Sequence, residues 1–594
     1  MFICIIFLFL HTKFQKKNIV EEPKIGILKI DLNGPLKEKY YSEQNIEGNF
    51  LKKIFNHNIN IKKNSLFLLC KKIKQAKEDK NIKAILLNFE NFGGGSQPAL
   101  EYFGECLKKF KKSGKPIYSV GKNYSQAQYY LASFSNLIFL KKHGTIDFNG
   151  ISIKNFYYKD ILDKLHVNVH VFRTGKYKSA VEPITRNGPS EEIKKENLKI
   201  IHFLWKQYLK KISINRKIKI EKICPFLNKK IFKFKDIDED MTKYAKNNRL
   251  VDYVLSNKNI NNILRKKFSE LTNNKRYKLI NIYEYKLKLL NDNKKNEFPS
   301  IGIITNDGSI LNDINNENAI NISTTISKIQ SAKKDKNIKA LIFFINSPGG
   351  TLAESEKIRK SLNNFKKSKK PLIILMGGTT ASGGYWISTA GDYIISSPTT
   401  ITGSIGIFNY FYTLEKSLKS LGIYYDNTAI SNFRDNNIFH DISPELKKFI
   451  KFHINMNYKK FLEIVAKSRH KSIEEIEKIA EGKIWTGYQA KKIGLVDQLG
   501  NLDDAIKKAS EMTNLKNFHI KFIYTKKNTI LSNFLFLKTN KFIEKRFFNI
   551  FQMYFPLFSK KNINSFKFNK DLIYIINNEN KEYLYSLNNR NFIK

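Results

Sequence analysis

Short apolar runs that end in turn residues alternate along this chain with longer segments in which apolar residues recur every three or four positions. Residues 22–34 (EPKIGILKIDLNG) and 114–121 (GKPIYSVG) have the composition of buried strands. Residues 202–212 (HFLWKQYLKKI) have the periodicity of an amphipathic helix. Strands that alternate with helices predict parallel βαβ units, and therefore an α/β fold.

The second half of the chain repeats this pattern, with strand-like runs at 298–309 and 369–378 and a helical pattern at 452–465. The hexapeptide DKNIKA occurs at 79–84 and again at 335–340, which is 335 − 79 = 256 positions later. At the same offset the flanks also match: Ile73 with Ile329, Ala76 with Ala332, and Gly93-Gly94 with Gly349-Gly350. The chain therefore contains an internal duplication.

The duplication divides the 594 residues into four expected segments. These are a short apolar N-terminal anchor or stub (1–21), a first repeat (22–297), a second repeat (298–515) and a basic, aromatic-rich C-terminal extension (516–594). The boundary between the repeats is placed in the polar stretch at 290–298. Residues 542–558 predict a helix that Pro556 interrupts and that packs against another domain or subunit.

The N-terminal segment contains an entirely apolar run at residues 2–10, whereas a membrane-spanning helix needs about 20 residues. No basic region precedes this run and no small-residue cleavage site follows it, so it fits poorly to a cleaved signal peptide. We expect a minimal membrane anchor, either the end of a helix that begins upstream or an interfacial stub. A buried strand is the alternative.

The formal net charge of +51 does not by itself predict a nucleic-acid partner. Only 11 of the 104 basic residues are arginine, the residue that reads bases and phosphates bidentately. Lysine, asparagine, isoleucine, phenylalanine and tyrosine are all abundant and share A/T-rich codons, which accounts for the excess of lysine. The four cysteines form no CxxC pair, and the histidines form no HExxH motif, so we expect neither a metal nor a cofactor.

The two halves differ at a serine. Ser382 lies in TASGGYW, between a predicted strand and a predicted helix, where the helix N-terminus would stabilise negative charge. Counting back by 255 or 256 positions reaches Ala127 or Gln126, and neither side chain is a nucleophile. The alternative is that Ser382 is only a helix N-cap. A second glycine pair favours chemistry, because the backbone N–H groups of Gly349, Gly350 and Gly383 could together hold an oxyanion.

A nucleophilic serine needs a base. The second half has no histidine before His440, so a Ser-His-Asp triad is not favoured. Lys178 lies in a stretch (171–192) where glycine, serine, alanine, valine and proline interrupt the abundant lysines, whereas its counterpart at 429–437 has no lysine. Most lysines are solvated surface charges, but here each half keeps one partner of a possible Ser-Lys pair.

A lysine base must be neutral, so the pKa of Lys178 would have to fall by about 3 from its ordinary value of about 10.4. Burial can lower a lysine pKa by that amount. The apolar neighbours Ala180, Val181 and Ile184 are compatible with burial. The carboxylate of Glu182 would oppose the shift if it pointed inward.

Five motifs, in this order, resemble the long form of the signal peptide peptidase A (protease IV) family: YKSAVEP (177–183), INSPGG (345–350), ASGGYWIS (381–388), TGSIGI (402–407) and EGKIWTGYQAKKIGLVDQLG (481–500). The resemblance covers about residues 22–515 and implies two tandem domains of the Clp protease/crotonase-like fold. It implies that Ser382 is the nucleophile, Lys178 the general base, and Gly349, Gly350 and Gly383 the oxyanion hole, with Ser404 orienting the lysine.

The resemblance also implies a substrate and a location. The family degrades signal peptides left after preprotein cleavage, at the outer, periplasmic face of the cytoplasmic membrane, and forms homo-oligomers, so a tetramer is expected. This chain departs from the family in its shorter apolar N-terminus and in the tail beyond about 515, which is too diverged to be aligned with the family. Two alternatives remain: a crotonase-like acyl-CoA enzyme, and an inactive membrane-associated scaffold.

Overall fold

The computed structural model describes residues 25–39, 64–224, 241–273, 275–287, 298–311, 318–426, 428 and 437–524. The predicted anchor, residues 290–297 of the predicted boundary and the 542–558 segment lie outside this part of the chain. None of the described helices combines the length and the apolar composition that crossing a bilayer requires.

The first half builds a sheet of six parallel strands in the order β8-β6-β5-β4-β1-β9. The strands are β1 (Gly26–Asp31), β4 (Ile82–Asn88), β5 (Ile117–Gly121), β6 (Leu137–Lys141), β8 (Tyr253–Leu255) and β9 (Lys278–Asn281). The predicted strands at 22–34 and 114–121 are β1 and β5. Both faces of the central strands are buried, which is why their sequences are continuous apolar runs.

The second half repeats this strand order. Its sheet runs β18-β10-β11-β12, then continues through β13 to β17, and β14 and β16 extend it from the end of β12. These strands are β10 (Ser300–Asp307), β11 (Ile338–Ser347), β12 (Leu372–Ala381), β13 (Tyr393–Ser396), β14 (Ile401–Gly403), β16 (Ile484–Thr486), β17 (Gln498–Leu499) and β18 (His519–Phe522). Pairing with β10 places β18 in this sheet, beyond the 298–515 range expected for the second repeat. The α/β class and the tandem duplication are confirmed.

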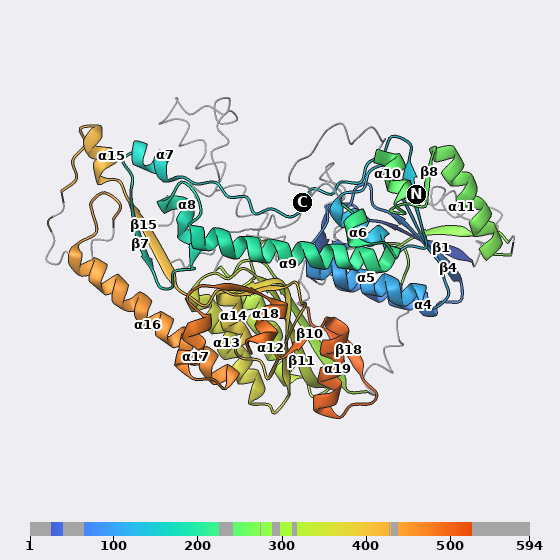
Figure 1. The fold of residues 1–594 in the computed structure, drawn as a ribbon. Helices are drawn as coiled ribbons and strands as arrows, with labels where there is room; N and C mark the ends of the chain where they lie inside the picture. Colours follow the sequence, from blue (N-terminus) through green and yellow to red (C-terminus); the bar gives the residue numbers. More distant parts are fainter. Residues whose placement is uncertain are drawn as a thin grey trace, which may run out of the picture.

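Helices cover both faces of each sheet (Figure 1). The first repeat contributes α4 (Leu66–Glu78), α5 (Gln97–Lys111), α6 (Gln126–Ala132), α10 (Met241–Asn247) and α11 (Asn257–Leu271). The second contributes α12 (Ile322–Lys334), α13 (Leu352–Lys366), α14 (Gly383–Ser388), α18 (Gly487–Lys492) and α19 (Leu502–Thr513). Helix α11 packs on one face of the first sheet, and α4 and α5 pack on the other.

One hydrophobic core joins the two repeats, because α4 and α5 also pack against the second sheet. Phe67 of α4 meets Phe344 of β11 edge to face, with 5.0 Å between ring centroids. Asp503, in the first turn of α19, forms ion pairs with Lys74 and Lys109 of the first repeat. The repeats are therefore held as one packed body.

A two-stranded antiparallel ribbon connects the repeats at one end of the molecule (Figure 1). It pairs β7 (Asn168–Arg173) with β15 (Phe408–Thr413), and Arg173 lies opposite Phe408. The helices at this end (Figure 1) are α7 (Lys159–Lys164), α8 (Glu182–Thr185), α15 (Glu415–Ser420) and α16 (Pro444–Arg469), and α17 (Ile473–Ile479) packs against α16. Helix α9 (Glu191–Arg216) runs from this end to the first repeat, where it contacts α6 (Figure 1). The two predicted amphipathic helices lie within α9 and α16. The ribbon brings the residues that follow β7 close to those that precede β15.

Equivalent hydrogen bonds fix the alignment of the two copies. The hydroxyl of Tyr129 in α6 donates to the carbonyl of Leu250 at 2.7 Å, and that of Tyr385 in α14 donates to the carbonyl of Leu495 at 2.8 Å. Because 385 − 129 = 256, Gln126 occupies the place of Ser382. The first copy therefore has an amide side chain where the second has a hydroxyl.

Candidate active site

Ser382 lies at the junction between β12 and α14, in a backbone conformation that serine seldom adopts. Its φ is 53° and its ψ is −118°, and its N–H donates to the carbonyl of Gly403 at 2.9 Å. A non-glycine residue in this region is strained, and such strain concentrates at functional sites. The side chain makes no capping hydrogen bond to α14, so the structure does not use Ser382 as the N-cap that the alternative interpretation required.

Lys178 follows β7 and reaches Ser382 from the other repeat. Its amine donates to the Ser382 hydroxyl at 2.9 Å, to the Ser404 hydroxyl at 3.0 Å and to the Ser404 carbonyl at 3.0 Å. Only 3% of the residue is exposed. The structure thus brings together three residues predicted from separate stretches of sequence, within hydrogen-bonding distance.

Burial lowers the pKa of the Lys178 amine from its ordinary value of 10.5 to about 7. The charged form is disfavoured because the amine is withdrawn from water. Glu182, which could have opposed this shift, turns its carboxylate away and accepts hydrogen bonds from the hydroxyl and the N–H of Ser190. A substantial fraction of Lys178 is therefore neutral near pH 7.

The three predicted oxyanion-hole glycines are close together but not equivalent. The N–H of Gly349 donates to the hydroxyl of Ser347 at 3.2 Å. Among the hydrogen bonds of the described residues, none uses the N–H of Gly350 or of Gly383 as donor. A Cβ atom placed on Gly383 would lie 3.3 Å from the nitrogen of Gly350, so these two groups are neighbours. The geometry favours Gly350 and Gly383 as oxyanion donors over Gly349.

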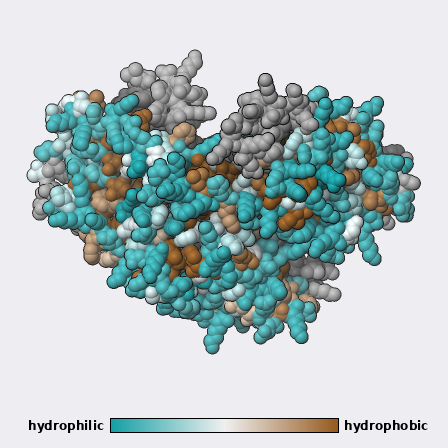
Figure 2. Space-filling view, viewed as in Figure 1, coloured by the Kyte–Doolittle hydropathy of each residue, from teal (hydrophilic) through white to brown (hydrophobic). Residues whose placement is uncertain are grey.

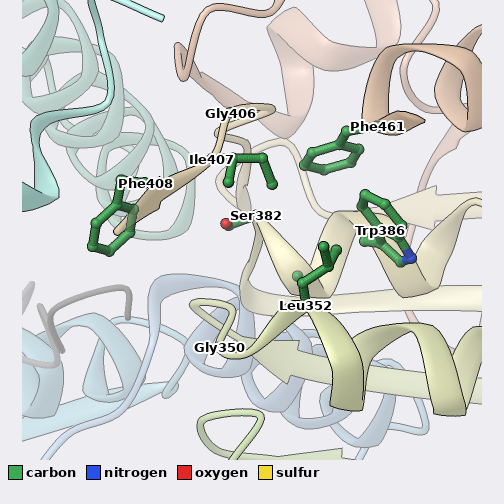
Figure 3. Close-up of a pocket in the computed structure, with 9 residues that line it drawn as sticks. Gly350, Leu352, Ser382, Trp386, Gly406, Ile407, Phe408 and Phe461 are labelled. Carbon is green, nitrogen blue, oxygen red and sulfur yellow. The ribbon is translucent and has the colours of Figure 1, made fainter. Parts of the chain in front are cut away.

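A small, mostly apolar pocket opens beside Ser382 (Figure 3). Its side-chain walls are Leu352 of α13, Trp386 of α14, Phe408 of β15, Phe461 of α16 and Ile407 in the loop before β15. Figure 3 shows the rings of Trp386 and Phe461 on one side of the serine and the Phe408 ring on the other. These walls place apolar surface next to the Ser382 hydroxyl.

Comparison with known proteins identifies the enzyme class. The model of peptidase family S49 matches residues 109–268 and 364–516. Protease 4 of Salmonella typhi is 39% identical over 512 residues, which cover 86% of this chain and 82% of that protein. The chain belongs to peptidase family S49. As a family S49 member it is a serine protease, and this favours the peptidase hypothesis over the acyl-CoA enzyme and the scaffold.

Two further similarities cover only about a third of this chain. A putative signal peptide peptidase SppA of Enterococcus faecium is 36% identical over 33% of this chain and 57% of that protein. The solved structure of a ClpP1 variant from Listeria monocytogenes aligns with 34% of this chain and 94% of its own, with a TM-score of 0.23 and 16% identity. Of the two S49 matches, one contains Lys178 and the other contains Ser382 and Ser404.

The sequence did not identify the pocket walls. Phe461 lies in α16, 461 − 382 = 79 positions after the serine, and belongs to a helical pattern that is equally consistent with a simple core position. Ile407 did lie inside a recognised motif, TGSIGI, but nothing in the motif indicates that it faces a pocket. Only the folded arrangement assigns these side chains to the site.

Proposed function

We propose that this S49 protease hydrolyses peptide bonds with a Ser-Lys dyad, in which Ser382 is the nucleophile and Lys178 the general base. The observation that carries the proposal is the 2.9 Å contact between the buried Lys178 amine and the Ser382 hydroxyl. A lysine can accept a proton only when it is neutral, and burial is the physical cause that makes it so.

The proposed reaction begins when the Ser382 oxygen attacks the peptide carbonyl carbon and its proton passes to the neutral amine of Lys178. The oxyanion accepts hydrogen bonds from the N–H groups of Gly350 and Gly383. The C–N bond then breaks, and the lysine ammonium returns the proton to the leaving amine. Water next attacks the acyl-enzyme and gives a proton to Lys178, and the ester bond breaks as Ser382 regains its hydroxyl.

Ser404 has a supporting role in this proposal. Its hydroxyl and its carbonyl both accept hydrogen bonds from the Lys178 amine at 3.0 Å, so they fix the direction in which the amine points. A neutral amine has two N–H groups and one lone pair. If both N–H groups donate to Ser404, the lone pair faces the Ser382 hydroxyl and can accept its proton. Orientation of a base is a large part of its catalytic effect.

The proposed substrates are apolar peptides, with cleaved signal peptides as the first candidates. The apolar pocket beside Ser382 supports this class, and so does the name of the Enterococcus faecium relative. We further propose action at the periplasmic face of the cytoplasmic membrane by a homo-oligomer, a tetramer by family resemblance, with the 2–10 segment contributing to attachment.

The experiment is hydrolysis of a synthetic signal peptide by the full-length protein and by single variants. We expect Ser382→Ala, Lys178→Ala and Lys178→Arg to lose activity by a factor of about 10³ or more while keeping the wild-type circular dichroism spectrum. Near-normal turnover by Lys178→Ala would remove the lysine from the mechanism. Membrane fractionation and light scattering of the same protein test the proposed attachment and oligomer.

A further inference from the structure

The segment that carries Lys178 is docked on the second repeat by backbone contacts that depend on glycine. Three stretches meet there: 174–178 of the first repeat, and 403–407 and 480–483 of the second. Thr174 N–H donates to the Ile407 carbonyl at 2.9 Å, and Tyr177 N–H donates to the Glu481 carbonyl at 3.0 Å. These two bonds anchor the lysine segment on both sides of its turn.

The 480–483 stretch is bonded to the serine side of the site as well. Gly482 N–H donates to the Ile405 carbonyl at 2.8 Å, and Ser404 N–H donates to the Lys483 carbonyl at 2.8 Å. One short loop therefore holds the Tyr177 backbone on one side and the Ser404 backbone on the other. The loop bridges the base and the residues that orient it.

Two glycines allow the backbones to approach this closely. A Cβ atom on Gly482, which has a φ of +78°, would lie 2.6 Å from the Lys178 nitrogen and 2.8 Å from its Cα and Cβ atoms. A Cβ atom on Gly175, which has a φ of +86°, would overlap the backbone of Glu481. Contacts below 3.0 Å force a movement, and the neighbouring atoms here are backbone rather than flexible side-chain ends.

We propose that Gly482 and Gly175 are positioning residues, whose missing side chains set the distance between the Lys178 amine and Ser382 and keep water from the amine. The inference rests on the proposed Ser-Lys mechanism. A methyl group at position 482 must push the Lys178 backbone away. The amine would then lose its 2.9 Å contact with Ser382 and become more hydrated.

The two consequences have different signatures. Displacement of the amine lowers kcat, because misplacing a reacting group by about 1 Å can cost a factor of about 100. Hydration of the amine raises its pKa, so the acidic limb of the pH–rate profile moves to higher pH. A variant that was merely less well folded would lose activity at every pH without moving this limb.

The test is the pH–rate profile of full-length Gly482→Ala, measured with a synthetic apolar peptide. We expect kcat near pH 7 to fall by a factor of about 10 or more, the acidic limb to move up by about 1 pH unit, and activity to recover partly near pH 9 to 10. KM should stay within a factor of about 3, since the pocket walls are untouched. Gly422→Ala is the control, because Gly422 has a φ of +75° with no atom within 4 Å.

Gly406→Ala keeps the test decisive if Gly482→Ala does not fold. A Cβ atom on Gly406 would lie 3.1 Å from the Cα of Gly482 and 3.2 Å from the Thr174 carbonyl, a milder overlap that should give a smaller shift of the same sign. An acidic limb that stays at the wild-type pH in whichever variants fold overturns the positioning role. Retained activity in Lys178→Ala would instead overturn the dyad itself, so the two failures are distinguishable.

Discussion

The amine of Lys178 and the hydroxyl of Ser382 lie 2.9 Å apart although 204 positions of sequence separate them. Each residue comes from a different copy of the duplicated fold, and the position equivalent to Ser382 in the first copy is Gln126. The antiparallel pairing of β7 with β15 and the glycine-dependent docking of the 480–483 loop produce this contact. Divergence after duplication has therefore left one site assembled from both copies.

Replacement of Lys178 by methionine should remove activity and stabilise the fold. The native pKa of about 7 lies below the unfolded value of 10.5, so the buried amine disfavours folding by about 4 to 5 kcal/mol at and below pH 7. This penalty decreases as pH rises from about 7 and disappears near 10.5. Some hydrogen bonding is also lost, so we expect Lys178→Met to raise the free energy of unfolding by about 3 kcal/mol at pH 6.5.

Urea unfolding at pH 6.5 and at pH 10.5 checks this prediction. The control is Lys507→Met, because Lys507 has a side chain that is 77% exposed. Equal stabilities of wild type and Lys178→Met at both pH values would mean that the amine keeps an ordinary pKa.

Replacement of Ser404 by alanine should slow catalysis without preventing it. The variant loses the hydroxyl that accepts from Lys178 but keeps the backbone carbonyl that also accepts. Loss of one hydrogen bond to the base, worth about 1 to 1.5 kcal/mol, corresponds to a decrease in kcat of about tenfold. Steady-state kinetics should show little change in KM. Ser417→Ala, which removes a hydrogen bond to the Leu165 carbonyl instead of one to Lys178, should behave as wild type. An unaltered kcat in Ser404→Ala would exclude an orienting role for the hydroxyl.

Replacement of Leu352 by phenylalanine should change which side chain the protease accepts. Leu352 lines the pocket beside Ser382, so a larger residue reduces its volume. We expect kcat/KM for peptides with leucine before the cleaved bond to fall by about 10 to 100-fold relative to peptides with alanine there. Leu421→Phe, at a position that is 74% exposed, should leave this ratio unchanged. If the leucine-to-alanine ratio of kcat/KM is the same in Leu352→Phe as in wild type, the pocket does not bind the substrate side chain.

Replacement of Glu38 by glutamine should stabilise the contact between the repeats at neutral and higher pH. Glu38 is buried, and it accepts hydrogen bonds from Ser96 of the first repeat and from the N–H of Gly378 of the second at 3.1 Å. Burial, and then the charge of Asp307, raise the pKa of the Glu38 carboxyl from 4.5 to about 7. Ionisation above pH 7 therefore costs about 3 kcal/mol, and this cost vanishes as pH falls to about 4.5.

Thermal or urea unfolding at pH 8 and at pH 4.5 measures this effect. Glu38→Gln should exceed wild type in stability at pH 8 and match it at pH 4.5, whereas Glu191→Gln, at an exposed position, should change little at either pH. A destabilised Glu38→Gln at pH 8 would show that the carboxylate is needed in its ionised form.

The strands, the helices and their repetition were accessible from sequence because the pattern is local. Apolar runs such as 298–309 and the duplicated DKNIKA hexapeptide predict strands, helices and their repetition without reference to long-range contacts. The absence of a nucleophile at Ala127 and Gln126 in the first copy, together with the motif resemblance, was enough to select the two residues of the proposed dyad.

Other parts of the site depend on three-dimensional contacts that no local pattern encodes. The N–H of Gly349 is engaged by Ser347, two residues earlier, and only the folded turn distinguishes it from the N–H of Gly350. The packing of Gly482 against the Lys178 backbone depends on the positions of two segments from different repeats. Glu38 is buried because the two repeats pack together around it, and the residues next to Glu38 in the sequence do not indicate this.

The most direct measurement of the central claim is the rate at which a serine-reactive phosphonate labels Ser382 as a function of pH. A neutral Lys178 should activate the serine, so labelling should rise with pH about a midpoint near 7, and it should be abolished in Ser382→Ala. In Lys178→Met the rise should disappear. Labelling that is independent of pH in the wild type, or that keeps its rate and midpoint in Lys178→Met, would contradict the account.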